Sequence, residues 1–185
     1  MVSQRAENLR MINTDRNTLA SDTEVLEFAQ RAFQLARTGD AQMLERLLTK
    51  GLPPNMSNHN GDTLLMLAAY HGHAEAAEAL LEAGAEPDRF NDKGQTPLAG
   101  AIFKGFQPIV ELLLAHGAQP GFAPPGAKTP VMFAAMFNRL EILKLLLEHG
   151  ADIDARSTEG LSALDLARTM RAPDSVAFLE ALRPA

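Results

Sequence analysis

The chain has 185 residues and a formal net charge of −6, because 23 Asp and Glu outnumber 17 Lys and Arg. This balance, with scattered basic residues, argues against a nucleic-acid surface, which requires clustered Lys and Arg. The lack of cysteine rules out disulfides and thiolate metal sites. The chain begins without an apolar signal region and contains no run of about 18 apolar residues. We therefore expect a soluble, cytoplasmic protein that does not enter a membrane.

The N-terminal part of the chain changes from polar sequence to helical sequence near residue 22. Residues 1–22 are polar with few large apolar side chains, and we expect them to form a mobile arm. Ser21, Asp22 and Thr23 then offer N-cap oxygens ahead of the segment EVLEFAQRAFQLA, which predicts a first helix. The segment GDAQMLERLLTKG predicts a second helix that ends near Gly51, a residue suited to a left-handed C-terminal position.

Residues 61–159 repeat one pattern at a regular interval, over residues 61–93, 94–126 and 127–159. The aligned landmarks include Thr63, Thr96, Thr129 and Ser162, and also Gly51, Gly84, Gly117 and Gly150. A period of this length predicts a solenoid, because each unit is too small to bury its own apolar face and stacks on its neighbours. End units need a polar outer face. We therefore predict an N-terminal capping repeat over residues 23–60 and a C-terminal capping repeat over residues 160–185.

The repeated pattern resembles the ankyrin repeat. It combines G-x-T-P-L, a pair of alanines, a G-H step and the ending x-x-L-L-x-x-G-A-x-x-D, over about residues 24–183. The resemblance implies an all-α fold, an ankyrin-repeat solenoid of stacked helix-turn-helix units with turn or β-finger connections. The chain departs from the pattern where Met66, Ala99, Met132 and Asp165 replace a histidine, and where Asn138 and Arg171 replace the glycine that ends the first helix. Leu64 and Ala163 also stand where two prolines would be. All of these replacements are expected to lower local stability without changing the register.

Each central unit shows the same predicted packing. Thr and Pro open the first helix, because the hydroxyl accepts from an early N–H and Pro is tolerated at the first position. Small pairs such as Ala68 and Ala69 allow neighbouring first helices to approach closely, and pairs such as Leu80 and Leu81 form most of the core. The segment 121–126 contains Pro124 and Pro125, which remove two backbone donors, so its finger is expected to be opened or reshaped. This change fits either a tolerated loop variation or a loop that contacts a partner.

The sequence offers little that suggests chemistry. His71 and His73 give a weak metal signal, since no third ligand is spaced to join them. His73 matches the G-H step, where we expect it to cap the connection between two helices. The glycines fall at repeat junctions, not in a phosphate-binding loop, and the serines lie outside any nucleophile motif. We predict that the protein is not an enzyme and has no metal and no cofactor.

The resemblance implies where a partner would bind. In ankyrin repeat proteins the fingers and the exposed positions of the first helix line the concave face, where partners usually bind. The matching positions with the strongest predicted role are Leu67, Tyr70, His71, Phe90, Asp92, Lys93, Phe103, Lys104, Phe133, Met136 and Phe137. Further finger positions are Ser57, Asn58, His59, Asn60, Asn91, Ser157, Thr158 and Glu159. Five of the chain's ten Phe and Tyr residues fall in this set, which indicates an aromatic surface for a partner.

The main functional prediction is a non-catalytic module that binds a protein or peptide partner on its concave face, as a monomer. The aromatic residues also fit three different roles, which stay open: packing between adjacent first helices, contact with a lid formed by the N-terminal arm, and self-association. An alternative function is a dedicated stoichiometric regulator, an inhibitor or stabiliser of one enzyme.

Overall fold

A computed structural model describes residues 22–182 of the chain. The predicted arm is outside these residues except for Asp22, so neither its mobility nor its role as a lid is addressed by them. Ten α-helices follow one another in this part of the chain. Their bounds are α2 (Asp22–Thr38), α3 (Ala41–Thr49), α4 (Leu64–His71), α5 (Ala74–Glu82), α6 (Pro97–Lys104), α7 (Gln107–Ala115), α8 (Pro130–Met136), α9 (Leu140–Glu148), α10 (Ala163–Thr169) and α11 (Pro173–Ala181).

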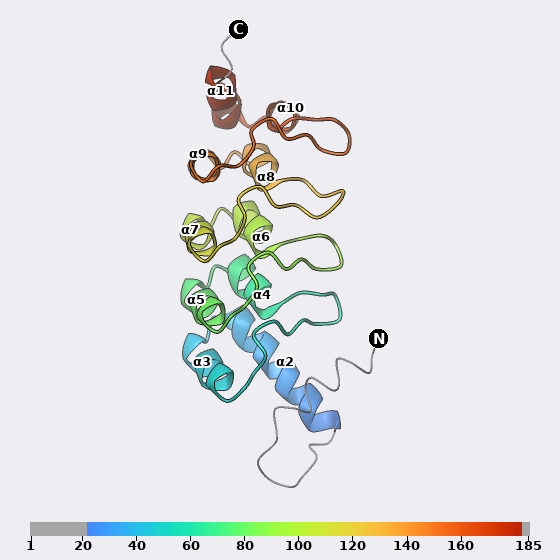
Figure 1. The fold of residues 1–185 in the computed structure, drawn as a ribbon, viewed down its shortest axis with the longest axis vertical. Coiled ribbons are helices and arrows are strands. Elements are labelled where there is room, and N and C mark those ends of the chain that lie inside the picture. Colours follow the sequence, from blue (N-terminus) through green and yellow to red (C-terminus); the bar gives the residue numbers. More distant parts are fainter. Residues whose placement is uncertain (1–21, 183–185) are drawn as a thin grey trace.

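The helices form five consecutive pairs that stack along one axis (Figure 1). We call α4, α6, α8 and α10 the inner helices; they lie in one column, and α2 packs on α4 at its end. We call α3, α5, α7, α9 and α11 the outer helices, which form the second column. Finger loops project on the inner side, one before each inner helix. This arrangement confirms the predicted all-α solenoid, whereas the exact boundaries of the five units stay a prediction.

The inner helices begin as the repeated Thr and Ser predict. Thr63, Thr96, Thr129 and Ser162 each stand at the N-cap, where the side-chain oxygen accepts from the backbone N–H three residues later. Pro follows directly in α6 and α8. These caps satisfy one donor that the helix itself leaves unpaired, so each inner helix starts at the same point of the repeat.

The inner helices end in left-handed backbone. Gly72 and Gly105 have φ values of 86° and 80°, which glycine adopts readily. Asn138 and Arg171 occupy the matching positions with φ values of 53° and 55°. The side chain of Asn138 compensates by donating to Asp174 Oδ2 at 2.7 Å and accepting from the backbone N–H of Ser175 at 3.0 Å. The side chain of Arg171 is exposed, and no such bond is seen for it within residues 22–182.

The core lies between the two helix columns. The small inner-helix pairs, including Ala68, Ala69, Ala134 and Ala135, are completely buried, as predicted. The outer helices contribute large aliphatic side chains, and Leu80, Leu113 and Leu146 are all 0% exposed. Burial of a leucine side chain contributes about 1.5–3 kcal/mol. The core is therefore continuous from one pair to the next.

Side chains after each inner helix join neighbouring pairs. Phe106 packs so closely on Gly72 that a β-carbon there would lie 2.9 Å from its ring. Arg139 packs on Gly105 in the same way and donates to the carbonyl of Phe103 at 3.1 Å. His73 lies at the N-cap of α5, but the prediction that it caps this connection is wrong, because its side chain makes no cap bond. Its Nε2 instead lies 2.8 Å from the carbonyl oxygen of Arg37 in the preceding pair.

The fingers share a hydrogen-bond pattern that one of them lacks. Asn58, Asn91 and Ser157 each donate their backbone N–H to the carbonyl four residues later. Pro124 occupies the matching position, so that bond is lost, while the tight turn survives through the bond from Ala127 N–H to Pro124. Pro125 replaces Asp92, whose N–H joins two fingers by donating to Asn60 at 3.0 Å. The finger is thus reshaped as predicted, at two specific bonds.

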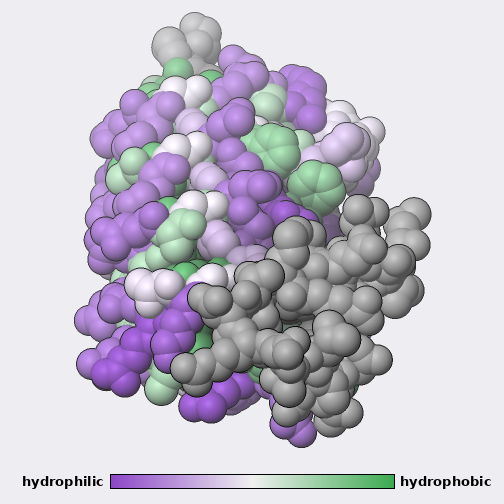
Figure 2. Space-filling model, turned by 60° about the horizontal axis from the view of Figure 1, so that its bottom comes forward, coloured by the Kyte–Doolittle hydropathy of each residue, from purple (hydrophilic) through white to green (hydrophobic). Residues whose placement is uncertain are grey.

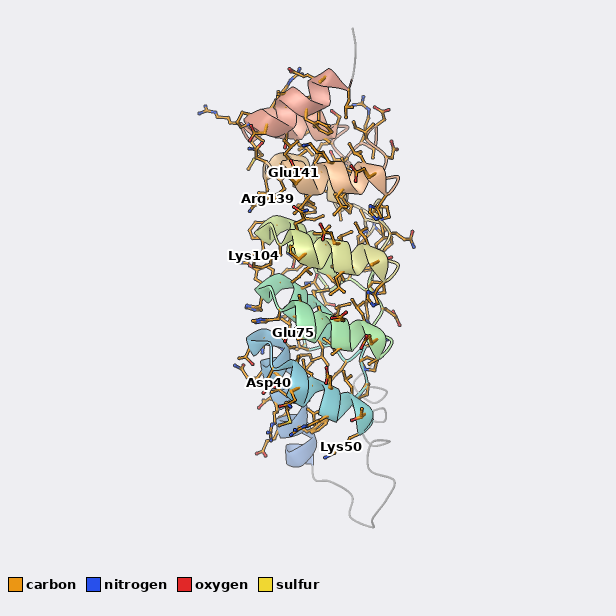
Figure 3. All side chains as sticks on the ribbon, turned by 90° about the vertical axis from the view of Figure 1, so that its left-hand side faces the viewer. Asp40, Lys50, Glu75, Lys104, Arg139 and Glu141 are labelled. Atoms are coloured by element: carbon orange, nitrogen blue, oxygen red, sulfur yellow. The ribbon has the colours of Figure 1, made fainter. Side chains whose placement is uncertain are left out.

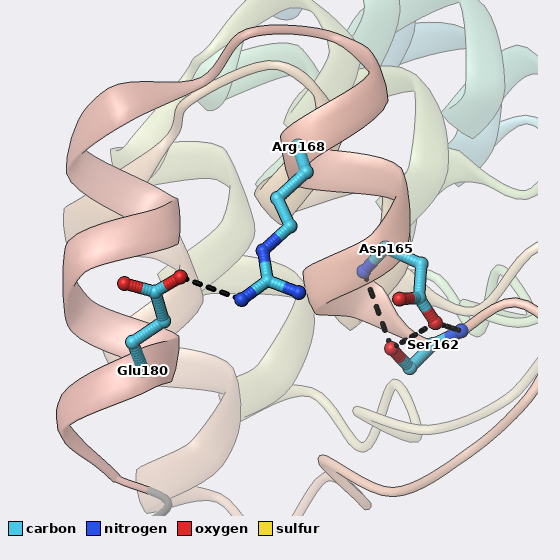
Figure 4. A network of polar contacts seen from close by, with 4 residues as sticks. All are labelled: Ser162, Asp165, Arg168 and Glu180. Atoms are coloured by element: carbon cyan, nitrogen blue, oxygen red, sulfur yellow. Dashed lines mark hydrogen bonds and ion pairs between the residues drawn. The ribbon is translucent and has the colours of Figure 1, made fainter.

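Polar contacts complete the last pair (Figure 4). Ser162 and Asp165 form a reciprocal capping box at the start of α10, with the Ser162 hydroxyl donating to Asp165 Oδ2 at 2.6 Å. Arg168 of α10 forms an ion pair with Glu180 of α11 at 2.7 Å. Both side chains are about half exposed, so this pair contributes little, on the order of 0–1 kcal/mol. The ion pair links α10 to α11, but it adds little to the free energy of unfolding.

Candidate functional site

The predicted site residues from the first helix of each repeat lie in columns along the inner helices. Because the repeat has a constant length and each inner helix starts at the same cap, equivalent positions come from successive helices. One column contains Tyr70, Phe103 and Met136, and its neighbour contains His71, Lys104 and Phe137. A third column contains Leu67, Gly100 and Phe133. The fold therefore brings together residues that are far apart in the sequence.

Four of these residues form a continuous row of rings, which we call the aromatic row: Tyr70, Phe103, Phe133 and Phe137. The Tyr70 and Phe103 rings stack with centroids 6.4 Å apart, and Phe103 meets Phe137 edge to face at 4.9 Å. Phe137 stacks on Phe133 at 6.2 Å. Tyr70 and Phe103 are 38% and 44% exposed, although both are large apolar side chains. Exposed aromatic surface of this kind is typical of an interaction site.

Packing accounts for part of the predicted set. Phe133 and Met136 are partly buried and pack against the core. Leu67 does the same on α4. These three residues therefore serve internal packing at least in part, while Tyr70 and Phe103 remain accessible.

A groove of about 530 Å³ opens between the inner helices and the fingers, and we call it the inner groove. Its residues come from α4, α6 and α8, from two fingers and from the end of α2. They are Arg37, Asn60, Asp62, Met66, Leu67, Tyr70, His71, Asn91, Lys93, Gln95, Thr96, Ala99, Gly100, Phe103 and Phe133. Six of the eleven positions with the strongest predicted role are among them, together with the further finger positions Asn60 and Asn91. Apolar walls with a few polar groups suit the binding of a side chain or short segment.

Several groove residues were missed by the sequence prediction. Arg37 is the most important, and it lies one repeat length before Tyr70, so extending the repeat into the first unit would have found it. Gly100 was passed over because it has no side chain. It lies against the Tyr70 ring, and a β-carbon there would make an ordinary contact with Tyr70 Cδ2 at 3.6 Å.

The fingers divide into structural and accessible positions. Asn91 is only 5% exposed. Its side chain donates to Asp62 Oδ1 at 2.7 Å and to Gln95 Oε1 at 3.0 Å. It therefore ties two fingers together, and the prediction of a contact position underestimated its structural role. Asp92 and Lys93 are exposed on the same finger.

Phe90 lies apart from the aromatic row. It is 48% exposed and its ring packs near that of Phe122, at 6.4 Å. Together with Pro124 and Pro125 it borders a second hollow of about 520 Å³ between two fingers. The structure thus separates Phe90 from the groove that contains Tyr70 and Phe103.

Basic groups gather at one end of the inner groove. Lys104 Nζ lies 4.7 Å from the centroid of the Tyr70 ring, a cation–π contact. Burial lowers the pKa of His71, and the positive charges of His73, Arg37 and Lys104 lower this pKa further. The rings of His71 and His73 stack at 6.3 Å. Within residues 22–182 no three potential ligands converge into a metal site.

The stacked helix pairs and their fingers define a helical repeat protein, and comparison with known families identifies the kind of repeat. A family model described as "Ankyrin repeats (3 copies)" matches residues 32–123, and one described as "Ankyrin repeats (many copies)" matches residues 113–167. The chain belongs to the ankyrin repeat family. Ankyrin repeats are generally protein–protein interaction modules without catalytic activity.

One relative comes from Pseudomonas aeruginosa and carries the name "Putative ankyrin repeat protein PA3287". The two sequences are 57% identical over 60 residues, which is 32% of this chain and 35% of the relative. The match thus spans about a third of that protein's length.

No helix within residues 22–182 combines the length and the apolar character that crossing a membrane requires.

Proposed function

We propose that this protein is a non-catalytic binding module that holds a protein or peptide partner in the inner groove. The observation that supports this most is the exposure of Tyr70 and Phe103, two stacked rings that the core does not need. Burying both rings against a partner would remove a large apolar area from water. Family membership supports binding as the general role, and the groove supports this particular surface. We include the monomeric state and a cytoplasmic location in the proposal.

The test compares capture of partners by three forms of the full-length protein. The Tyr70→Ser, Phe103→Ser double variant removes the accessible rings, and because both are exposed it should leave the fold intact. Leu182→Ser is the matched control, since Leu182 is 47% exposed at the end of the last helix, away from the groove. We expect proteins captured from the native cell by wild type and control to be lost with the double variant. Equal capture by a folded double variant would place the binding surface elsewhere.

The alternative function, a dedicated enzyme regulator, would use the same groove but would have an enzyme as its partner. An activity assay on the captured partner, with and without the purified chain, distinguishes a regulator from a passive adaptor. Light scattering over a dilution series tests the monomer, and a mass that rises with concentration would support self-association instead.

A further inference from the structure

Charge is distributed unequally between the two helix columns. The outer helices α5, α7 and α9 carry more charged residues than the inner helices α4, α6 and α8, and Figure 3 labels two of them, Glu75 and Glu141. The charged residues of these outer helices are Glu75, Glu78, Glu82, Glu111, Glu141, Lys144 and Glu148. The inner helices α4, α6 and α8 contain no Asp or Glu at all. In Figure 2 the outer-helix side at the left is mainly hydrophilic, and larger hydrophobic side chains lie toward the finger side.

The inner groove therefore has a positive character in a chain whose net charge is −6. Arg37 and His71 line the groove at the ends of α2 and α4, and Lys104 at the end of α6 lies over the Tyr70 ring that also lines it. The positive charges of Arg37 and Lys104 are close enough to His71 to lower its pKa, in addition to the effect of burial. Lys93 adds a further cation from a finger. Like charges gathered in this way repel one another, so a carboxylate placed among them would relieve that repulsion.

The cations Arg37, Lys93 and Lys104 lack carboxylate partners in the described part of the chain, whereas the lowered pKa of His71 favours its neutral imidazole, which can still donate a hydrogen bond. The ion pairs found within residues 22–182 join Lys144 to Glu141 and Arg168 to Glu180, both outside the groove. Asp62 is the acidic residue that lines the groove. Its two oxygens already accept from Asn58 Nδ2 at 3.0 Å and from Asn91 Nδ2 at 2.7 Å. Asp62 is thus held by the fingers, and the positive end of the groove is available to an outside anion.

Apolar and cationic surface adjoin directly. The Lys104 ammonium lies over the Tyr70 ring, and that ring stacks on Phe103. A ligand that satisfies both must present an apolar side chain beside a carboxylate. We propose that the partner segment held by the inner groove contains an Asp or Glu next to aromatic or large aliphatic residues, with the carboxylate at the end formed by Arg37, His71 and Lys104. This inference rests on the proposed function and specifies the chemistry of the partner.

Charge also favours a peptide partner over two other occupants. Residues 1–21 contain Glu7 two positions before Leu9, but Arg5 and Arg10 flank this pair, and Arg16 against Asp15 leaves the segment with more basic than acidic residues. The chain's own N-terminal segment is therefore a poorer charge match than an acidic peptide. A nucleic acid is a polyanion and would be repelled by the acidic outer helices and the net negative charge. A single carboxylate within a short apolar segment interacts only over a few ångströms, and screening reduces its repulsion by distant acidic residues.

The experiment selects binders from a random peptide display library on the immobilised full-length protein. We expect the enriched peptides to carry Asp or Glu within two positions of Phe, Trp, Tyr or Leu. One enriched peptide is then synthesised with a fluorescent label, beside a copy in which Lys replaces its acidic residues. Enrichment of basic or purely apolar peptides would overturn the inference.

A charge reversal then tests the contact itself. Lys104→Glu should weaken binding of the acidic peptide by about tenfold or more and strengthen binding of its Lys copy. Lys144→Glu on α9 is the matched control, and its dissociation constant for the acidic peptide should stay within about twofold of wild type. Raising the ionic strength from about 0.05 M to about 0.5 M should weaken the acidic peptide's binding to wild type. If Lys104→Glu leaves both peptides unaffected, the carboxylate does not bind at this end.

Further measurements distinguish an error in the proposed partner chemistry from an error in the proposed binding function. Peptides that bind wild type but not the Tyr70→Ser, Phe103→Ser variant, without any acidic preference, would retain the groove and overturn its proposed chemistry. Peptides that bind this variant as well as wild type would overturn the groove itself. Saturable binding of labelled oligo-deoxythymidine that competes with the peptide would identify a nucleic-acid site and overturn the inference. Loss of peptide binding when residues 1–21 are deleted would also overturn the inference, because it would show that this segment is part of the site.

Discussion

At the residue scale, the two non-glycine helix ends show how local strain is compensated. Asn138 and Arg171 both have positive φ, a conformation that costs an ordinary L residue roughly 1–2 kcal/mol. Arg171→Gly should therefore stabilise the protein by about 0.5–1 kcal/mol, after the extra entropy of glycine in the unfolded chain is subtracted. Urea denaturation followed by circular dichroism measures this change.

Asn138→Gly is the matched comparison, because it removes the same kind of strain and two hydrogen bonds as well. The bonds to Asp174 and Ser175 contribute about 0.5–1.5 kcal/mol each. We expect this variant to be less stable than wild type. A loss of stability in Arg171→Gly would show that the arginine backbone is not strained.

Individual residues also show the limits of what sequence can predict. The caps at Thr63, Thr96 and Thr129 follow from the residue type and its period, and the structure confirms them. The contacts that a side chain makes with a neighbouring repeat are harder to predict. His73 reaches back to the carbonyl of Arg37, and Phe90 packs near Phe122. Both contacts depend on the spacing between neighbouring pairs, which no single repeat encodes.

At the element scale, α10 begins with a capping box that responds to pH. The hydroxyl of Ser162 lowers the pKa of Asp165 below its usual value of 3.8, with help from the backbone N–H of Ser162. The folded pKa is therefore lower than the unfolded pKa. The stabilisation by this carboxylate is complete above the unfolded value and is lost as pH falls through the folded value.

Asp165→Asn tests this sign directly. We expect the melting temperature of wild type to exceed that of the variant by a constant amount at neutral pH, and this difference to shrink below about pH 4. Glu78→Gln on α5 is a control, since no hydrogen bond of that exposed carboxylate is seen within residues 22–182. A difference between wild type and Asp165→Asn that grows on acidification would contradict the assigned role.

The fingers mark a second limit at this scale. Two adjacent prolines predict that the finger at 121–126 is altered, and the structure specifies the lost bonds. Pro124 removes the backbone bond within the finger. Pro125 has no N–H and so cannot make a bond between fingers like the one that Asp92 donates to Asn60. The tight turn survives because Ala127 still donates to Pro124. Composition alone predicts the missing donors, whereas the surviving turn depends on tertiary context.

At the scale of the whole molecule, the period predicts the fold far better than the site. A constant repeat length implies stacking, and stacking determines which helices share a column. The aromatic positions follow from that register, so Tyr70, Phe103 and Phe137 could be placed on one surface. The exposure of these side chains could not be predicted, because Met136 lies in the same column as Tyr70 and Phe103 and yet packs partly against the core. The basic cluster also includes Arg37 of the first unit, which the prediction of binding positions did not cover although it lies one repeat length before Tyr70.

Stacking also makes the end units essential for the units that they cover. The inner helix α10 packs on α8, and α11 packs on α9. On α8, Val131 and Met132 are each only 1% exposed. Deleting residues 160–185 removes both covering helices and exposes apolar surface of α8 and α9 to water. We expect the free energy of unfolding to fall by about 3 kcal/mol or more, the burial of one or two such side chains.

The measurement is urea denaturation combined with light scattering over a dilution series. The newly exposed face should also make the shortened chain associate as concentration rises, since apolar patches of this size are rarely left open. Deleting only residues 183–185 is the control, because the chain then keeps α10 and α11 and should match wild type in both measurements. If the long deletion leaves a monomer of unchanged stability, the last pair is not a cap and the solenoid is closed by α8 and α9 themselves.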